Sequence, residues 1–153
     1  MVKLLIVCMG NICRSPMAQA VMAKRITDAG LTKMISVESA GTHASREGDR
    51  PDGRAEASLA RRGYKLGRFR YRRVSPQDFE RFDWILAMDL DNLGKLREIC
   101  SPEHLPKIQL YLDYSVSASV ASVPDPYYGN AQGFDHVLDL CEAGATGWMN
   151  KLA

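Results

Sequence analysis

The 153-residue chain lacks the features that mark several large classes of protein. Its four cysteines, at positions 8, 13, 100 and 141, follow neither the spacing of a disulfide-stabilised domain nor that of a zinc site. No apolar run approaches the length that spans a membrane, and Met1-Val2-Lys3 leads directly into a strand rather than a signal peptide. The net charge of +2 is too small to indicate nucleic acid or a membrane surface as a partner. We therefore expect a protein of the reducing cytoplasm.

Repeats and low-complexity stretches are also missing, and the length suits one domain over residues 1–153. Apolar runs predict short buried strands, and segments of helical periodicity separate them. The expected strands cover residues 4–7, 35–37, 82–88 and 108–110, and the expected helices cover 16–29, 52–62, 76–79, 89–99 and 133–148. This alternation predicts an α/β three-layer sandwich, a four-stranded parallel sheet with helices on both faces.

The segment between the first strand and the first helix carries the residues most suggestive of chemistry. A strand that feeds a tight loop and then a helix directs backbone N–H groups at one point, which makes an anion site. Cys8 lies at the mouth of this helix beside Arg14, so we expect it to attack as a thiolate. Arg14 can bind two oxygens of a tetrahedral oxyanion, and Ser15 can donate a hydrogen bond to the sulfur. Asn11 is suited to a left-handed conformation within the loop. The segment predicts phosphoryl transfer through a cysteinyl-phosphate.

Hydrolysis of an aryl phosphate also needs a proton for the leaving phenolate, which neither a thiolate nor an arginine can supply. Asp125 lies between Pro124 and Pro126 in a stiffened loop and is the candidate acid. Tyr127 and Tyr128 would then flank the mouth of the site and stack on a phenol ring.

Three motifs resemble those of the low-molecular-weight protein tyrosine phosphatases. Cys8–Pro16 looks like the phosphate-binding loop of that family, and Ser39–Thr42 and Asp125–Gly129 match two further family motifs at the expected distances. The resemblance implies hydrolysis of phosphotyrosine in proteins and of small aryl phosphates, without a metal or other cofactor. It implies Cys8 as nucleophile, Arg14 as ligand of the phosphoryl oxygens, and Asp125 as general acid and then base.

The resemblance also implies that inorganic phosphate or another oxyanion is the product or an inhibitor. The residues expected to contact phosphate or substrate are Met9, Gly10, Asn11, Ile12, Cys13, Ser15, Ser39, Tyr127 and Tyr128. Family members can also pair the two cysteines equivalent to Cys8 and Cys13 as a reversible disulfide.

The sequence departs from the family pattern at two places. Residues 43–47 contain none of the aromatic side chains that relatives commonly carry there, and Phe69–Arg72 replaces a His-x-Ala-Arg pattern. These changes predict a cleft that is more open and more basic on that side. The basic run over residues 61–73 could also contact nucleic acid or an acidic surface, although solvated charge at the rim is favoured.

Two other functions remain open from the sequence. An arsenate reductase uses the same fold and a similar loop, but it needs further cysteines near the site, and Cys100 lies a full helix away from the third strand. A phosphotyrosine-binding module would need neither Asp125 nor a reactive Cys8.

Several structural expectations concern residues outside the loop. Ser39 is expected to hydrogen-bond Asn11 or the phosphate loop, and Asp89 to cap the helix over residues 89–99. That helix is expected to bury Leu90, Leu93, Leu96 and Ile99, and the thiols of Cys100 and Cys141 are expected to be buried. Gly144 and Gly147 are expected to weaken the last helix.

Overall fold

The computed structural model describes residues 1–11, 13–43, 51–67, 69, 71–116, 120–126 and 131–152. Within these ranges, every helix is too short or too polar to span a bilayer. The loop residue Ile12 and the expected substrate residues Tyr127 and Tyr128 lie outside the described residues.

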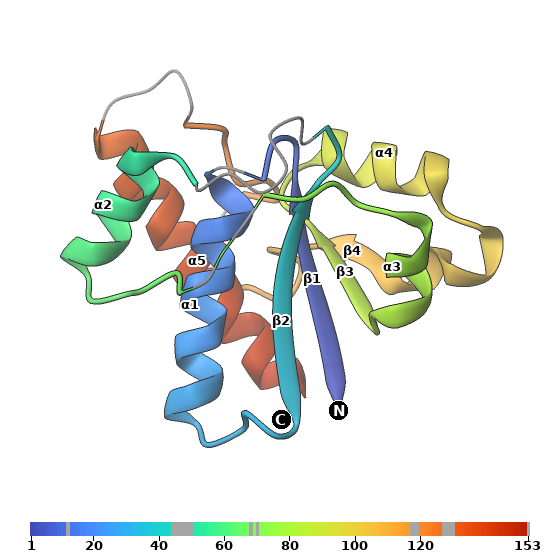
Figure 1. The fold of residues 1–153 in the computed structure, drawn as a ribbon, viewed down its shortest axis with the longest axis horizontal. Coiled ribbons are helices and arrows are strands. Elements are labelled where there is room, and N and C mark those ends of the chain that lie inside the picture. The colour runs from blue at the N-terminus through green and yellow to red at the C-terminus, as the bar shows by residue number, and fades with distance from the viewer. Residues whose placement is uncertain are drawn as a thin grey trace.

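The sheet has the four parallel strands that the sequence predicts (Figure 1). Its strands are β1 (Val2–Cys8), β2 (Ile35–Gly41), β3 (Trp84–Ala87) and β4 (Ile108–Leu110), in the order β2-β1-β3-β4. All three pairings are parallel. The strand β2 continues beyond the expected end at Val37, because it pairs with β1 as far as Gly41, which lies beside Cys8. The carboxyl ends of β1 and β2 therefore meet at one edge, where ligands of such sheets bind.

Helices cover both faces of this sheet, as predicted. Figure 1 shows α1 (Arg14–Asp28), α2 (Gly53–Arg61) and α5 (Ala131–Leu152) on one side, with α3 (Pro76–Arg81) and α4 (Leu90–Ile99) on the other. A 3-10 helix, η1 (Pro102–Lys107), leads into β4. Alternate residues of β1 face the two layers: Leu4 and Ile6 join one core cluster with α1 and α5, and Leu5 and Val7 join the other with α3 and α4.

Residues with strong local preferences begin and end the helices. Gly30 and Gly63 have φ values of 71° and 81° just beyond α1 and α2, as expected of left-handed caps. The side chain of Asp52 accepts a hydrogen bond from Arg54 N at the start of α2. A capping box of Ser75 and Asp78 begins α3.

The predicted burial of α4 is only half right. Leu93 and Leu96 pack in the core, but Leu90 and Ile99 are 61% and 56% exposed. Only the middle of α4 packs against the sheet, so the apolar residues at its two ends remain at the surface. Cys100, directly after α4, is half-buried rather than buried, whereas Cys141 in α5 is fully buried as predicted.

The helix α5 continues through Gly144 and Gly147 to Leu152, and both glycines lie at close contacts with another segment. A Cβ on Gly144 would overlap the ring of Tyr111, and a Cβ on Gly147 would overlap the backbone carbonyl of Tyr114. The close approach is held by hydrogen bonds: Tyr111 Oη donates to Cys141 O at 2.6 Å, and Trp148 Nε1 donates to Tyr111 O at 2.8 Å. Glycine is used here because it lets α5 lie directly on the chain that follows β4.

Candidate active site

The chain between β1 and α1 folds back over the sulfur of Cys8. The backbone N–H of Asn11 donates to Cys8 Sγ at 3.2 Å, and Ser15 Oγ lies 3.0 Å from the same sulfur. Cys8 is 2% exposed and is the last residue of the central strand β1. Pro16 lies in the first turn of α1, where its missing N–H leaves no helical bond unmade. A backbone N–H and a hydroxyl of the loop therefore contact the Cys8 sulfur, as the sequence predicts for a phosphate loop.

Asn11 holds this loop in place. Its φ of 56° confirms the predicted left-handed conformation. Its Nδ2 donates to Ser15 Oγ at 2.9 Å and to Ser39 Oγ at 3.1 Å, which confirms the expected contact with Ser39. Ser39 in turn donates to Gln19 Oε1 at 2.5 Å. Ser39 is thus bonded to loop and helix side chains, and it contributes to the position of the loop through Asn11.

An ion pair with a buried carboxylate supports Asn11 from the other side. The backbone N–H of Arg72 donates to Asn11 Oδ1 at 3.1 Å. The guanidinium of Arg72 binds both oxygens of Asp78, at 2.9 and 3.1 Å, and the Asp78 side chain is completely buried. Ser75 N also donates to Asp78, at 2.8 Å. Asp78 therefore fixes the segment that carries Arg72, and that segment fixes Asn11.

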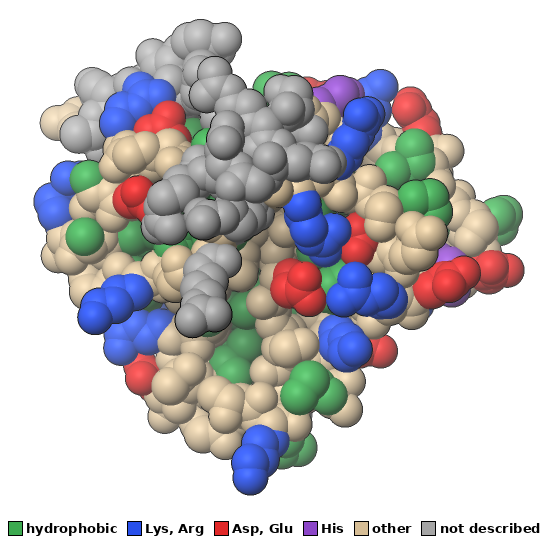
Figure 2. Space-filling view, in the orientation of Figure 1, with side chains coloured by type: hydrophobic (Ala, Val, Ile, Leu, Met, Phe, Trp, Pro, Cys, Tyr) green, Lys and Arg blue, Asp and Glu red, His purple; other side chains and the backbone are tan. Residues whose placement is uncertain are grey.

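The basic segment over residues 61–73 forms ion pairs within the molecule. Arg61 pairs with Asp135 at 3.1 Å, and Arg62 pairs with Asp139 at 2.7 Å and with Glu142 at 2.6 Å. Figure 2 shows basic and acidic side chains interspersed over the described part of this face. These pairs favour the rim-charge interpretation over a nucleic-acid site. Arg68 and Arg70, and residues 44–50, lie outside the described residues.

Arg14 is buried and held by carboxylates from two distant segments. Its Nη1 donates to Asp89 Oδ2 at 2.5 Å and to Val123 O at 3.0 Å, while its Nη2 lies 3.7 Å from Asp125 Oδ2. Burial lowers the pKa of Arg14, but Cys8, Asp89 and Asp125 more than offset this, so its pKa is raised. The guanidinium is therefore a fixed positive charge between the thiol and two carboxylates.

Asp89 has two functions, of which the sequence predicted one. Its Oδ1 accepts from Asn92 N at 2.7 Å, so it caps α4 as expected, while its Oδ2 accepts from Arg14. Asp125 is the more accessible carboxylate, with 41% of its side chain exposed. The structure thus brings Cys8, Arg14 and Asp125 to one edge of the sheet, as the three sequence motifs predict. Asp89, which follows the end of β3, lies at the same edge as expected, and its bond to Arg14 is the new finding.

The remaining loop residues differ in exposure. Met9 is 50% exposed, whereas Cys13 is buried. Burial raises the pKa of the Cys13 thiol, and the nearby Asp52, Cys8 and Asp125 raise it further. Both Cys8 and Cys13 are free thiols in this structure.

Comparison with known proteins agrees with this geometry. The family model described as "Low molecular weight phosphotyrosine protein phosphatase" matches residues 3–153. The chain belongs to this family.

A putative low-molecular-weight protein-tyrosine-phosphatase of Synechocystis is 46% identical over 151 residues, which cover 98% of this chain and 96% of the Synechocystis chain. The human low-molecular-weight phosphotyrosine protein phosphatase is 35% identical over 151 residues, covering 97% of this chain and 94% of its own. A crystal structure of an Entamoeba histolytica protein tyrosine phosphatase, with Hepes in its active site, superposes with a TM-score of 0.96 at 41% identity, covering 99% of this chain and 97% of the other.

In this low-molecular-weight phosphatase, Gly41 explains why the second motif lies beside the first. A Cβ at Gly41 would lie 2.8 Å from Met9 O and 3.0 Å from Asn11 N. Hydrogen bonds from Thr42 N to Cys8 O, at 2.9 Å, and from His43 N to Met9 O, at 2.8 Å, continue the contact beyond the strands. Only glycine lets the phosphate loop lie directly on the end of β2. The Ser-Ala-Gly-Thr pattern carried this signal, but the contact that requires the glycine becomes evident only in three dimensions.

Proposed function

We propose that this phosphatase hydrolyses phosphotyrosine in proteins, and small aryl phosphates, through a cysteinyl-phosphate on Cys8. The observation that carries the proposal is the convergence on one sheet edge of the Cys8 sulfur, its loop donors, and the Arg14–Asp89 pair. The chemistry of these groups suits phosphoryl transfer, because little covalent work beyond displacement is needed and charge stabilisation dominates.

In the first step, the Cys8 thiolate attacks phosphorus and the bond from phosphorus to the phenolic oxygen breaks. Asp125 gives its proton to that oxygen, so a neutral phenol leaves and Asp125 becomes a carboxylate. Arg14 binds equatorial phosphoryl oxygens. Arg14 Nη1 is bonded to Asp89, and Arg14 Nη2 lies on the side of Asp125. The phosphoryl group therefore enters between Arg14 and Asp125.

In the second step, the Asp125 carboxylate takes a proton from water while the water oxygen attacks phosphorus. The bond between sulfur and phosphorus breaks, inorganic phosphate leaves, and the Cys8 thiolate is restored. Ser15 Oγ, 3.0 Å from the sulfur, can donate a hydrogen bond to the thiolate as it departs.

The backbone of Met9–Cys13 and the Ser15 side chain form the phosphate cradle, and Ser39 acts through Asn11 rather than on phosphate. Tyr127 and Tyr128 stay predicted as the walls of the entrance. We also propose that residues 1–153 form a single domain, since both core clusters share one sheet. A reducing compartment, the cytoplasm, suits a reaction that needs a free Cys8 thiol. The proposed partners are phosphotyrosine proteins, with inorganic phosphate or other oxyanions as product or inhibitor.

Leaving-group dependence tests this mechanism. With EDTA present, wild-type protein should release phosphate from aryl phosphates, and Cys8→Ser should abolish the release. Asp125→Asn should keep most activity on an ester of a very acidic phenol. On phosphotyrosine, whose phenol has a pKa of about 10, it should lose about 10²–10⁴-fold. Glu80→Gln, at an exposed carboxylate on α3, is the matched control.

The outcomes separate the proposal from its alternatives. An equal loss across all leaving groups would mean that Asp125 only holds its loop in place. Binding of phosphotyrosine without any turnover would indicate a binding module. Thiol-dependent reduction of arsenate without ester hydrolysis would indicate an arsenate reductase, although neither of the two residues that follow β3, Met88 and Asp89, is a cysteine.

A further inference from the structure

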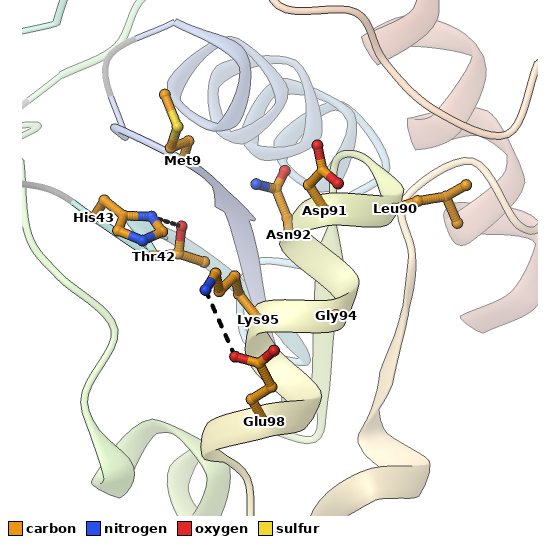
Figure 3. Close-up of a pocket in the computed structure, with 9 residues that line it drawn as sticks. All are labelled: Met9, Thr42, His43, Leu90, Asp91, Asn92, Gly94, Lys95 and Glu98. Atoms are coloured by element: carbon orange, nitrogen blue, oxygen red, sulfur yellow. Dashed lines mark hydrogen bonds and ion pairs between the residues drawn. The ribbon is translucent and has the colours of Figure 1, made fainter.

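A groove of about 430 Å³ lies beside the phosphate loop, between the ends of β1 and β2 and helix α4. We call it the α4 groove; it is lined by Met9, Thr42, His43, Leu90, Asp91, Asn92, Gly94, Lys95 and Glu98 (Figure 3). Its volume falls in the range of about 300–1,000 Å³ that is usual for ligand pockets. None of the proposed catalytic side chains lines it.

The α4 groove is continuous with the candidate active site. Met9 directly follows Cys8, is half-exposed, and forms part of the groove lining. The wall of the groove that faces α4 is hydrogen-bonded to the phosphate loop. Thr42 N donates to Cys8 O, and His43 N donates to Met9 O. A peptide whose phosphotyrosine enters the Cys8 loop would therefore have its next residues at the groove.

Asn92 shows that the groove can bind a polar group. Its side chain points from α4 toward Met9 in Figure 3 and is 97% buried, and its Oδ1 has no hydrogen-bond partner among the described residues. A buried acceptor without a partner is costly and needs an explanation. A primary amide presents an acceptor and a donor side by side, which matches the N–H and C=O of a peptide backbone. Rotation about the last side-chain torsion, which is broad for an amide, can turn either atom toward the groove.

The charges of the groove favour a basic side chain. Lys95 is paired with Glu98 at 3.6 Å, as the dashed line in Figure 3 shows. Asp91 is exposed and has no ion-pair partner in the part of the chain that the structure describes. Because Lys95 is paired with Glu98, the carboxylate of Asp91 can bind a cationic group of a ligand.

We propose that the α4 groove is a second subsite of this phosphatase, which binds the peptide segment next to phosphotyrosine. Asn92 binds the peptide backbone, and Asp91 selects a lysine or arginine side chain. This inference rests on the proposed function, since it assigns the flanking segment of the same substrate. This preference for a basic side chain differs from the expectation of a basic rim: Arg72 is paired with Asp78, and the α4 groove is lined by Asp91.

Gly94→Phe tests the groove without endangering the fold. A Cβ at Gly94 meets no atom within 4 Å, so a large side chain there would project into the groove, and replacing a mid-helix glycine favours the helix. We compare kcat/KM for a phosphotyrosine peptide with kcat/KM for a small aryl phosphate, which reaches only the phosphate loop. The ratio should fall about tenfold in Gly94→Phe. Arg97→Phe, on an exposed residue of the same helix that does not line the groove, should leave the ratio unchanged.

Charge reversal tests the selectivity. Peptides that differ only in Lys or Glu beside the phosphotyrosine should differ in KM about two- to fivefold in favour of Lys at low salt, as expected of an exposed ion pair. Asp91→Lys should reverse this preference, and added salt should reduce it. Preference of wild-type protein for the Glu peptide, or an unchanged ratio in Gly94→Phe, would overturn the inference.

The two proposals fail separately. If wild-type protein did not hydrolyse the small aryl phosphate, the proposed function would be wrong. Binding of a fluorescent phosphotyrosine peptide to wild-type and Gly94→Phe protein would then decide on the groove: weaker binding by the variant supports it, and equal binding overturns it.

Discussion

Asp89→Asn separates the two functions of one carboxylate. Asparagine is as good an N-cap as aspartate, so the bond from Asn92 N, now 2.7 Å long, should persist and α4 should keep its start. The substitution removes the negative charge that Asp89 presents to Arg14. Among the residues that the structure describes, the guanidinium then keeps Val123 O at 3.0 Å and Asp125 at 3.7 Å as close acceptors.

The structure sets the size of the effect. The side chain of Arg14 is 4% exposed and that of Asp89 is 23% exposed, so the pair lies between a surface ion pair and a fully buried one. Breaking a buried pair costs about 3–5 kcal/mol and breaking a surface pair up to about 1 kcal/mol. We therefore expect a loss of about 1–3 kcal/mol in the free energy of unfolding. Without its bond to Asp89, the Arg14 guanidinium is held less firmly in position. We therefore expect kcat/KM for an aryl phosphate to fall about 10–100-fold, which is about 1.4–2.7 kcal/mol of transition-state stabilisation.

Urea unfolding and steady-state kinetics on an aryl phosphate measure the two effects. Asp89→Ala is the companion variant, because it loses the cap as well and should unfold more easily than Asp89→Asn by about 1 kcal/mol. Wild-type kinetics in Asp89→Asn, together with a loss of stability confined to Asp89→Ala, would show that Asp89 is only a cap and that Arg14 does not depend on it.

Three further predictions concern other residues. Gly41→Ala should destabilise the protein by about 1–3 kcal/mol in urea unfolding and lower kcat, because its methyl group would lie 2.8 Å from Met9 O; normal activity would contradict the packing argument. Iodoacetamide at pH 7 should modify Cys8 and spare Cys13, whose pKa is raised by burial; peptide mass spectrometry that finds equal labelling would refute this. Burial and the hydrogen bond to Glu142 raise the pKa of Tyr64 to about 12, so the folded state holds this proton more tightly than the unfolded state. Its contribution to stability should therefore be lost as the pH rises from about 10 through 12, and Tyr64→Phe should show a smaller decline than wild type over this interval.

The parts of the site that sequence analysis predicted are those that depend on local geometry. Cys8, Asn11 and Ser15 lie within eight residues of one another, so a strand, a loop and a helix in succession suffice to predict that they lie together. Ser39 was also predictable, because it lies near the end of the neighbouring strand and parallel strands end at one edge.

Contacts between segments far apart in the chain were less accessible. The Arg14–Asp89 bond joins residues 75 positions apart, and the bond from Arg72 N to Asn11 joins residues 61 positions apart. The position of Asp89 just past a strand end was visible, but capping explains an aspartate there equally well. Only the register of β3 against β1, in which Ala87 lies beside Val7, brings Asp89 to the guanidinium.

Sequence patterns also say little about how much surface an element covers. The spacing of Leu90 and Ile99 fits a buried stripe, yet the sheet supports only the middle of α4. By propensity alone, Gly144 and Gly147 are expected to weaken the helix, and only the closeness of Tyr111 and Tyr114 shows why glycine is needed there. In both cases the deciding quantity is the distance to another element, which periodicity does not contain.

The packing of α5 has a consequence for the order in which this protein is synthesised and becomes active. Cys8 and Arg14 leave the ribosome first and Asp125 follows, but Leu4, Ile6 and Met17 share their core with Trp148, near the end of the chain. Until the last helix is made, the apolar face of β1 and α1 has no cover, and the nascent chain carries its reactive thiol on an unfinished core. A variant that lacks α5 (Ala131–Leu152) would keep every proposed catalytic residue but would leave one core cluster uncovered, so we expect it to lack a stable fold and therefore activity.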